Sequence, residues 1–157
     1  MFKKFPLHAD LLKAIEALKF HEPTPVQREA IPPVLDGRDV LVAAQTGTGK
    51  TLAFMLPVLH RMLTKPKPGV TALILLPTRE LAAQVATVAK EVGRFTTIRP
   101  ALLVGGESFT LQLQALRAGA PLIIATPGRL IDHLQRRTVT LANVHTLILD
   151  EADRMLD

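Results

Sequence analysis

A short loop carrying glycine, lysine and threonine has the residue types needed to hold phosphate groups. The stretch 44–51 reads Ala-Gln-Thr-Gly-Thr-Gly-Lys-Thr. Because Gly47 and Gly49 lack side chains, the backbone N–H groups between them can curl around phosphate oxygens. Lys50 can then reach the terminal phosphates of a nucleotide, and the Thr51 hydroxyl can ligate Mg²⁺. The pattern predicts a phosphate-binding loop at the start of a helix.

An acidic pair follows an apolar run near the end of the sequence. Asp150 and Glu151 come directly after residues 146–149. The Asp150 carboxylate can hold Mg²⁺ directly or through water, and Glu151 can orient and deprotonate a hydrolytic water. Alone, such a pair is more often a helix N-cap with a solvated neighbour. Combined with the phosphate-binding loop, it predicts nucleotide hydrolysis.

Two further junctions carry a threonine close to an arginine. They are Thr78 with Arg79, and Thr126 with Arg129. In each, the threonine can cap a helix, so that a hydroxyl, backbone N–H groups and a guanidinium face one edge. Ordinary capping is the alternative for either junction alone. Together with the glycine pair at 105–106, where backbone can approach a ligand closely, they predict a track that binds a sugar-phosphate backbone.

A glutamine near the N-terminus has the groups needed to read an adenine edge. Pro25 can open a helix, which places Gln27 in its first turn. The amide supplies both donors and an acceptor, and Phe20 is near enough in sequence to offer an apolar face. The alternative is a polar side chain on the helix surface, which ordinary exposure statistics favour.

Strands and helices alternate along the chain. Apolar runs predict buried strands at 39–43 and 71–76 and further strands at 99–104, 121–125 and 146–149. Helical spacing predicts helices at 9–18, from Pro25, from Lys50 to about Leu63, at 81–92, from Phe109 and around 130–134. The segment from Phe109 also alternates like a strand. In the helix around 130–134, Leu130, Ile131 and Leu134 are expected to face inward. This order predicts an α/β fold with a parallel sheet, helices on both faces and ligands at the carboxyl ends of the strands.

Composition limits the class of protein. The 157 residues are 48% hydrophobic and 21% charged, which suits one globular domain, and no apolar run approaches the length of a membrane span. The absence of cysteine excludes disulfides and fits a cytoplasmic protein. A net charge of +5 favours a polyanionic partner. With six Phe and no Trp or Tyr, such a partner would be held more by its backbone than by base stacking.

The ordered motifs resemble those of the DEAD-box RNA helicases. The resemblance is carried by Phe20, 23–27, 44–51, 77–82, 105–106, 126–129 and 150–153. Ala44, which replaces the first glycine of the general phosphate-loop pattern, is usual in that family. Lys19 departs from the family, which has glycine there, and we expect an altered turn. The resemblance implies a RecA-like P-loop NTPase domain over 1–157, with adenine-recognition helices at 1–36 and a P-loop core at 37–157.

The resemblance also implies roles for single residues. Those that would bind ATP are Phe20, Gln27, Gln45, Thr46, Gly47, Thr48, Gly49, Lys50 and Thr51. Those that would serve catalysis are Lys50, Asp150 and Glu151, with Thr51 and Asp150 holding Mg²⁺. Those that would touch RNA are Thr78, Arg79, Gly105, Gly106, Thr126, Gly128 and Arg129. Asp153 would couple the ATP and RNA sites.

Members of that family continue beyond the acidic motif. There a Ser-Ala-Thr motif lies on a strand between the phosphate-loop strand and the acidic-motif strand, and a second RecA-like domain supplies arginines to the ATP site. We therefore expect a gap in the middle of the sheet, in a RecA-like domain that is incomplete at its C-terminus and in a fragment that does not unwind RNA alone. A phosphate-loop ATPase or kinase acting on another substrate, and a non-enzymatic nucleotide- or RNA-binding module, are the alternatives.

Overall fold

The structure is a computed structural model that describes residues 1–45 and 49–156. It divides into two compact units, each described by itself. The N-terminal unit comprises Met1–Pro66 and Val88–Thr97. The sheet unit comprises Lys67–Thr87 and Ile98–Asp157.

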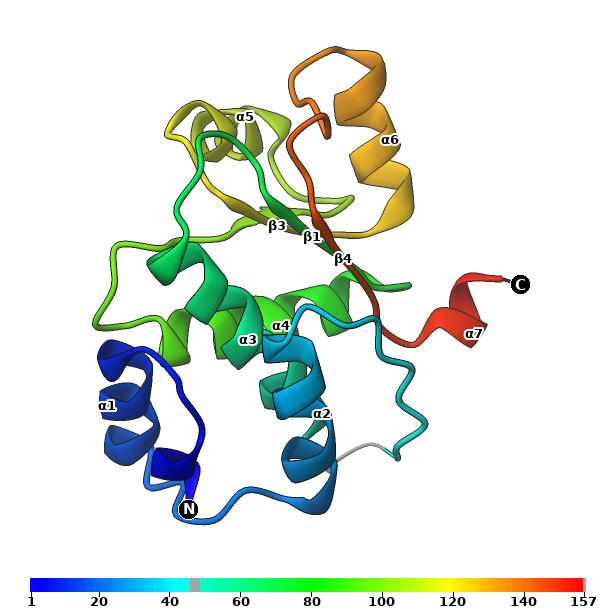
Figure 1. Cartoon of the computed structure of the whole chain (residues 1–157). Helices are drawn as coiled ribbons and strands as arrows, with labels where there is room; N and C mark the ends of the chain where they lie inside the picture. The colour runs from blue at the N-terminus through cyan, green and yellow to red at the C-terminus, as the bar shows by residue number, and fades with distance from the viewer. Residues whose placement is uncertain (46–48, 157) are drawn as a thin grey trace. The chain divides into compact units, whose positions relative to one another are not determined.

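The N-terminal unit is built from helices (Figure 1). They are the 3₁₀ turn η1 (Phe2–Lys4) and the α-helices α1 (Ala9–Ala17), α2 (Pro25–Leu35) and α3 (Lys50–Thr64). The imidazole of His8 caps α1 by accepting from the backbone of Asp10 at 3.1 Å. The largest side chains that are fully buried here are Leu11, Ile15, Ile31, Met55, Leu56 and Leu59. The predicted helices at 9–18 and from Pro25 are confirmed, and α3 continues through Pro57.

The sheet unit holds four parallel strands among its described residues, in the order β2-β3-β1-β4. The strands are β1 (Ala72–Leu75), β2 (Ala101–Leu103), β3 (Leu122–Ala125) and β4 (Thr146–Leu149). The helices that begin in this unit are α4 (Arg79–Val92), α5 (Phe109–Arg117), α6 (Pro127–Gln135) and α7 (Ala152–Met155). The Ser108 side chain caps α5, so the segment that also fitted a strand is helical. A parallel α/β sheet flanked by helices is confirmed.

The four strands end level with one another. Leu75 at the end of β1 lies opposite both Ala125 on β3 and Leu149 on β4. Leu103 at the end of β2 also lies opposite Ala125. Because all four strands run in the same direction, the residues that follow them emerge along one edge of the sheet.

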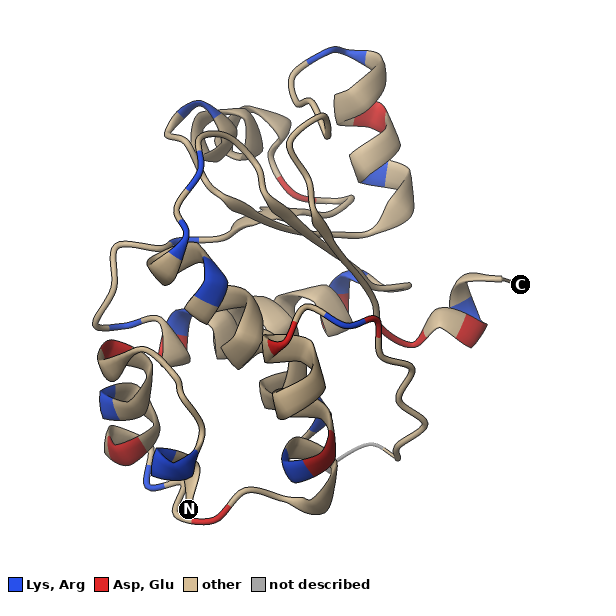
Figure 2. Ribbon diagram, viewed as in Figure 1, with Lys and Arg blue, Asp and Glu red and all other residues tan. Residues whose placement is uncertain are grey.

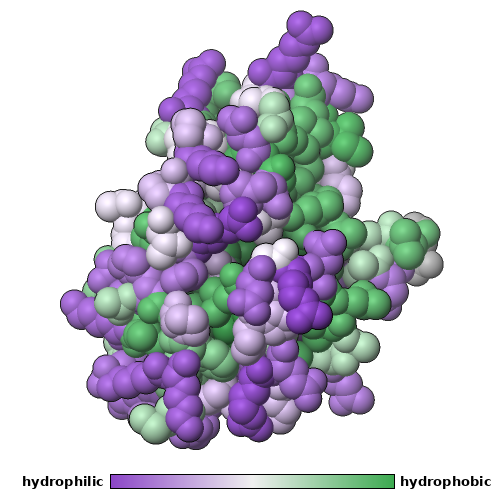
Figure 3. Space-filling view, viewed as in Figure 1, coloured by the Kyte–Doolittle hydropathy of each residue, from purple (hydrophilic) through white to green (hydrophobic). Residues whose placement is uncertain are grey.

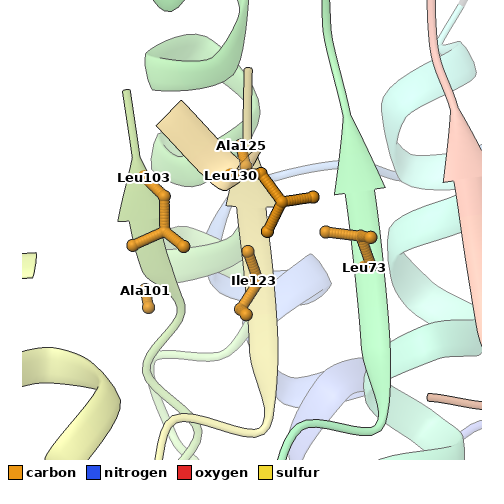
Figure 4. Packing of buried hydrophobic residues seen from close by; sticks show 6 residues of the cluster. All are labelled: Leu73, Ala101, Leu103, Ile123, Ala125 and Leu130. Carbon is orange, nitrogen blue, oxygen red and sulfur yellow. The ribbon is translucent and has the colours of Figure 1, made fainter. Parts of the chain in front are cut away.

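The core of the sheet unit lies under α5 and α6, which cover the same side of the sheet (Figure 1). Figure 4 shows the side chains at its centre: Leu73, Ala101, Leu103, Ile123, Ala125 and Leu130. Every residue of β3 is buried. Since successive side chains point to opposite faces, both faces of this central strand are covered.

The predicted buried strand at 39–43 is wrong. These residues form no strand, and Leu41 is 99% exposed. Strand geometry is stable only when a neighbouring strand pairs with the backbone N–H and C=O groups, and no described strand pairs with this segment. The segment therefore stays extended with its apolar side chains in contact with water.

Near the end of the chain, the predictions that helices cover both faces of the whole sheet and that Ile131 faces inward are also wrong. Leu147 and Leu149 on β4 are 57% and 53% exposed, and Figure 3 shows hydrophobic surface in this region beside α6. Among the described strands β4 pairs only with β1, so it is an edge strand. Ile131 is also exposed, because the inward face of α6 is formed by Leu130 and His133.

No helix of the described residues is long and apolar enough to cross a membrane.

Candidate functional site

The predicted phosphate-binding loop precedes α3, and the helix begins where the sequence predicts. Lys50 is the first residue of that helix, and Gly49 is its N-cap with a φ of 84°. This left-handed conformation suits glycine. Thr46, Gly47 and Thr48 lie outside the described residues. Thr51, in the first turn of α3, follows Lys50 at the end of the helix where backbone N–H groups attract anions.

Gln27 is bonded to the same glycine. Its side-chain amide donates to the carbonyl of Gly49 at 3.0 Å, and its oxygen accepts from the backbone N–H of Thr24 at 2.9 Å. The Thr24 hydroxyl in turn accepts from the Gln27 backbone, so the two residues form a capping box at the start of α2. Gln27 is only 2% exposed, so the expectation of a surface glutamine is wrong. Adenine recognition by this amide stays a prediction, and it requires the adenine to share or replace one of these bonds.

Phe20 follows α1 and is 45% exposed, as a residue offering an aromatic face to a ligand must be. Lys19 before it has a φ of 62°, the left-handed region that glycine favours. The Phe20 backbone N–H closes the turn by donating to Ile15 at 3.1 Å. Lysine is strained in this conformation, by about 1 kcal/mol relative to glycine.

Of the two predicted threonine caps, one is present and one is absent. The Thr78 hydroxyl accepts from the backbone N–H of Leu81 at 3.2 Å at the start of α4. The Thr126 side chain makes no capping bond to α6. Pro127 occupies the first position of that helix, where its fixed φ favours helix initiation without a side-chain cap.

The glycine loop, residues 105–108, brings the two predicted RNA-binding arginines to one place. Gly106 has a φ of 80°, and a Cβ there would overlap Nη1 of Arg79. On the other side, Nη1 of Arg129 donates to the carbonyl of Glu107 at 3.1 Å. Arg79 follows β1 and the loop follows β2, with β3 between them, so the Arg79 side chain crosses the end of β3. Gly105 and Gly128 have open space where a Cβ would stand.

Two buried polar residues behind Arg129 were not predicted from the sequence. Gln112 on α5 and His133 on α6 are 5% and 0% exposed, and 2.8 Å separates Gln112 Oε1 from His133 Nε2. Gln112 lies three residues after the apolar Phe109 and four before Leu116, and His133 lies three residues after Leu130. A polar residue within an apolar helix face is the signal that could have revealed them.

His133 is packed tightly between these elements. Its ring stacks on Phe109 with centroids 4.1 Å apart, and its Nδ1 lies 2.7 Å from the Thr138 hydroxyl. Burial lowers the pKa of His133 from its usual value, and the charge of Arg129 lowers it further. The imidazole is therefore neutral near pH 7.

The acidic pair lies at the end of β4. Asp150 is 9% exposed, and its carboxylate accepts from the backbone N–H of Glu151 at 3.0 Å. Glu151 takes the left-handed φ of 55° at the start of α7, and Asp153 is exposed within that short helix. The described residues contain no cluster of three or more His, Asp or Glu side chains that could hold a metal alone. A metal here would take further ligands from elsewhere, such as a nucleotide.

Comparison with known proteins agrees with the order of these motifs. The family model described as DEAD/DEAH box helicase matches residues 24–157. The chain belongs to the DEAD/DEAH box helicase family. It is 50% identical over 159 aligned positions to DEAD-box ATP-dependent RNA helicase 28 of Oryza sativa subsp. japonica, which covers 99% of this chain and 20% of the relative.

Mammalian members of the family are equally similar. The probable ATP-dependent RNA helicases DDX27 of Homo sapiens and Mus musculus are each 50% identical over 159 positions, covering 99% of this chain and 21% of the relative. The chain therefore spans about a fifth of the length of these relatives.

The close approach of Gly49 to Gln27 predicts that a methyl group at Gly49 lowers the stability of the chain. A Cβ at Gly49 would overlap the Gln27 amide nitrogen and stand 2.9 Å from the Thr24 hydroxyl, whereas one at Gly37 meets nothing within 4 Å. Both glycines have a φ near 80°, so their backbone strain is matched. Gly37→Ala should lower the free energy of unfolding by about 1 kcal/mol. Gly49→Ala should lower it by about 1–3 kcal/mol more, because a buried amide loses its partners. Equal losses in urea denaturation would contradict this.

The lowered pKa of His133 predicts a loss of stability in acid. The His133 imidazole takes up a proton at a higher pH in the unfolded chain than in the folded chain. The contribution of neutral His133 to the free energy of unfolding should therefore be complete above about pH 6.5. It should decrease as the pH drops from there through the pKa of the folded state. Because Gln can still donate to Gln112, His133→Gln should reduce this acid loss in urea denaturation. His21→Gln, at an exposed histidine, serves as the control. If His133→Gln lost as much stability in acid as the wild type, His133 would not be the group responsible. Burial also lowers the pKa of His60, so part of the loss should remain.

Proposed function

We propose that this chain is the ATP- and RNA-binding part of a DEAD-box RNA helicase that couples ATP hydrolysis to local separation of RNA strands. The observation that carries the proposal is the meeting of Arg79 and Arg129 at the glycine loop. Strand separation is proposed for the intact protein, because these 157 residues span only about a fifth of the relatives' length.

The RNA side of the proposal rests on donors gathered at the carboxyl edge of the sheet. The segments that follow β1, β2 and β3 contribute the Arg79 guanidinium, the backbone of Gly105 and Gly106, and the start of α6 with Arg129. Phosphodiester oxygens accept hydrogen bonds and carry negative charge, so such donors match them without reading bases. Figure 2 shows one basic position on α6 and a further one just beyond its end, with an acidic position between them.

Arg79 is well suited to change partners. Its Nε donates to Glu80 at 3.1 Å, and both side chains are largely exposed. An exposed ion pair contributes at most about 1 kcal/mol to stability, so an RNA phosphate can replace Glu80 at little cost. The phosphodiester would be held between this guanidinium and the backbone of Gly106. We assign Thr78, Thr126 and Gly128 to the same track.

The ATP side rests on the residues around the start of α3. The backbone there, with Lys50, would hold the phosphates, while Phe20 and Gln27 would hold adenine. Gln45, Thr46, Gly47 and Thr48 are assigned to the same loop from the sequence alone. Gln27 links the two parts of the nucleotide site, because its amide already contacts the glycine that precedes Lys50.

Mg²⁺ prefers oxygen ligands and keeps several waters, and the Thr51 hydroxyl and the Asp150 carboxylate are each oxygen donors of this kind. Thr51 would offer its hydroxyl and Asp150 its carboxylate, with the remaining ligands from phosphate and water. Bound Mg²⁺ supplies positive charge against the phosphates. Glu151 would orient and deprotonate the attacking water, and Lys50 would stabilise charge on the terminal phosphate. Asp153 would transmit the state of one site to the other.

The RNA part of the proposal predicts that a methyl group at Gly106 weakens RNA binding by displacing Arg79. In the intact protein, Arg79→Ala and Gly106→Ala should each weaken binding of single-stranded RNA about fivefold in fluorescence anisotropy, and Arg79→Ala should lower the salt-dependence slope by about 0.7. Gly119→Ala is the matched control, because Gly119 also has a positive φ but open space around it. RNA affinity unchanged in both test variants would sink the RNA assignment.

The ATP part predicts that binding of RNA and hydrolysis of ATP are separable. Lys50→Ala in the intact protein should lower RNA-stimulated ATP hydrolysis at least about 100-fold, since a transition-state charge loses its partner. RNA affinity measured without nucleotide should stay within about twofold, because Lys50 is assigned to phosphates of ATP. Hydrolysis that persists at the wild-type rate would remove Lys50 from the active site.

A further inference from the structure

We propose that Gln112 is a positioning residue for Arg129, which fixes one side of the guanidinium so that the other faces an RNA phosphate. The inference rests on the proposed function of this edge as an RNA site. Gln112 touches neither RNA nor nucleotide in this account. It acts through Arg129, and His133 holds it in place.

The orientation of the Gln112 amide is determined by its partners. Its Nε2 donates to the carbonyl of Val104 at 2.8 Å, and a carbonyl can only accept. Its Oε1 accepts from Nη1 of Arg129 at 3.1 Å, and a guanidinium can only donate. The two contacts independently require the same amide orientation. Val104 directly follows β2, so the amide is anchored to the end of that strand.

His133 occupies the second acceptor position on the same oxygen. Its Nε2 lies 2.8 Å from Gln112 Oε1, so this nitrogen must carry the hydrogen. The ring cannot turn away, because it is fully buried, stacked on Phe109 and bonded to Thr138. The Gln112 oxygen is therefore held between an imidazole N–H and the Arg129 guanidinium.

These contacts occupy one side of the Arg129 guanidinium. Nη1 donates both to Gln112 and to the Glu107 carbonyl, and Nε lies 3.8 Å from Asp132 Oδ2. Within the described part of the chain, Nη2 makes no hydrogen bond. The Arg129 side chain is 18% exposed, in contrast to 59% for Arg79. Arg129 is thus a pre-oriented donor, whereas Arg79 is largely exposed, and a pre-oriented donor loses less side-chain entropy on binding.

Replacing the Gln112 amide should therefore loosen Arg129 without removing any group that touches RNA. Gln112→Met keeps the length of the side chain and removes its hydrogen bonds, while Gln112→Asn keeps the amide but shortens its reach. In the intact protein each should weaken binding of a single-stranded RNA of about ten nucleotides roughly fivefold in fluorescence anisotropy. ATP affinity should stay within about twofold. Gln114→Met, on the exposed side of the same helix, is the matched control and should match wild type.

A double-mutant cycle with Arg129→Ala separates positioning from general damage. If Gln112 acts through Arg129, Gln112→Met should change RNA affinity less than about 1.5-fold once Arg129 is alanine. A fivefold effect that persists in the Arg129→Ala background would overturn the positioning role. So would equal losses of RNA and ATP affinity in both Gln112 variants, or wild-type RNA affinity in both while Arg129→Ala weakens binding. Wild-type RNA affinity in Arg129→Ala itself would instead count against the proposed RNA site.

Discussion

The level ends of the four parallel strands are the constraint on which the site in the sheet unit depends. Register places Leu75, Leu103, Ala125 and Leu149 in one row across the sheet. Adjacent strands are only about 4.8 Å apart, so segments that are distant in sequence emerge side by side. Basic and glycine-bearing segments follow the three strands β2, β3 and β1, and the acidic pair follows the edge strand β4. The order of the strands thus separates the donors that we propose to bind phosphodiesters from Asp150 and Glu151.

Within that row, the two arginines are held in different ways. One is exposed and paired with its neighbour Glu80, while Arg129 is mostly buried and bonded to the glycine loop and to Gln112. A donor that is already held in place loses little side-chain entropy on binding, whereas an exposed one loses more. Such a combination suits a family whose named relatives act on RNA, because binding to a sugar-phosphate backbone demands position rather than sequence readout.

The alternation of apolar runs with polar junctions was sufficient to predict the parallel sheet, four of its strands and the capping of α4 by Thr78. It failed where burial depends on partners that a local pattern does not contain. Residues 40–43 are all apolar, but no described strand pairs with them. Leu149 belongs to an apolar run that does form a strand, yet its side chain is exposed because β4 lies at the edge of the described sheet. The burial of Gln112 was not predicted, because a polar residue is usually exposed. Here Val104, Arg129 and His133 satisfy the buried amide with hydrogen bonds.

The central claim, that the glycine loop and the starts of α4 and α6 form one RNA-binding edge, is tested most directly by amide hydrogen exchange. The intact protein would be compared with and without a short single-stranded RNA. Exchange should slow together at 78–81, 105–108 and 126–129, because RNA would cover backbone N–H groups that the sheet brings to one edge. Unchanged exchange at all three segments, with protection confined to other parts of the chain, would contradict the account.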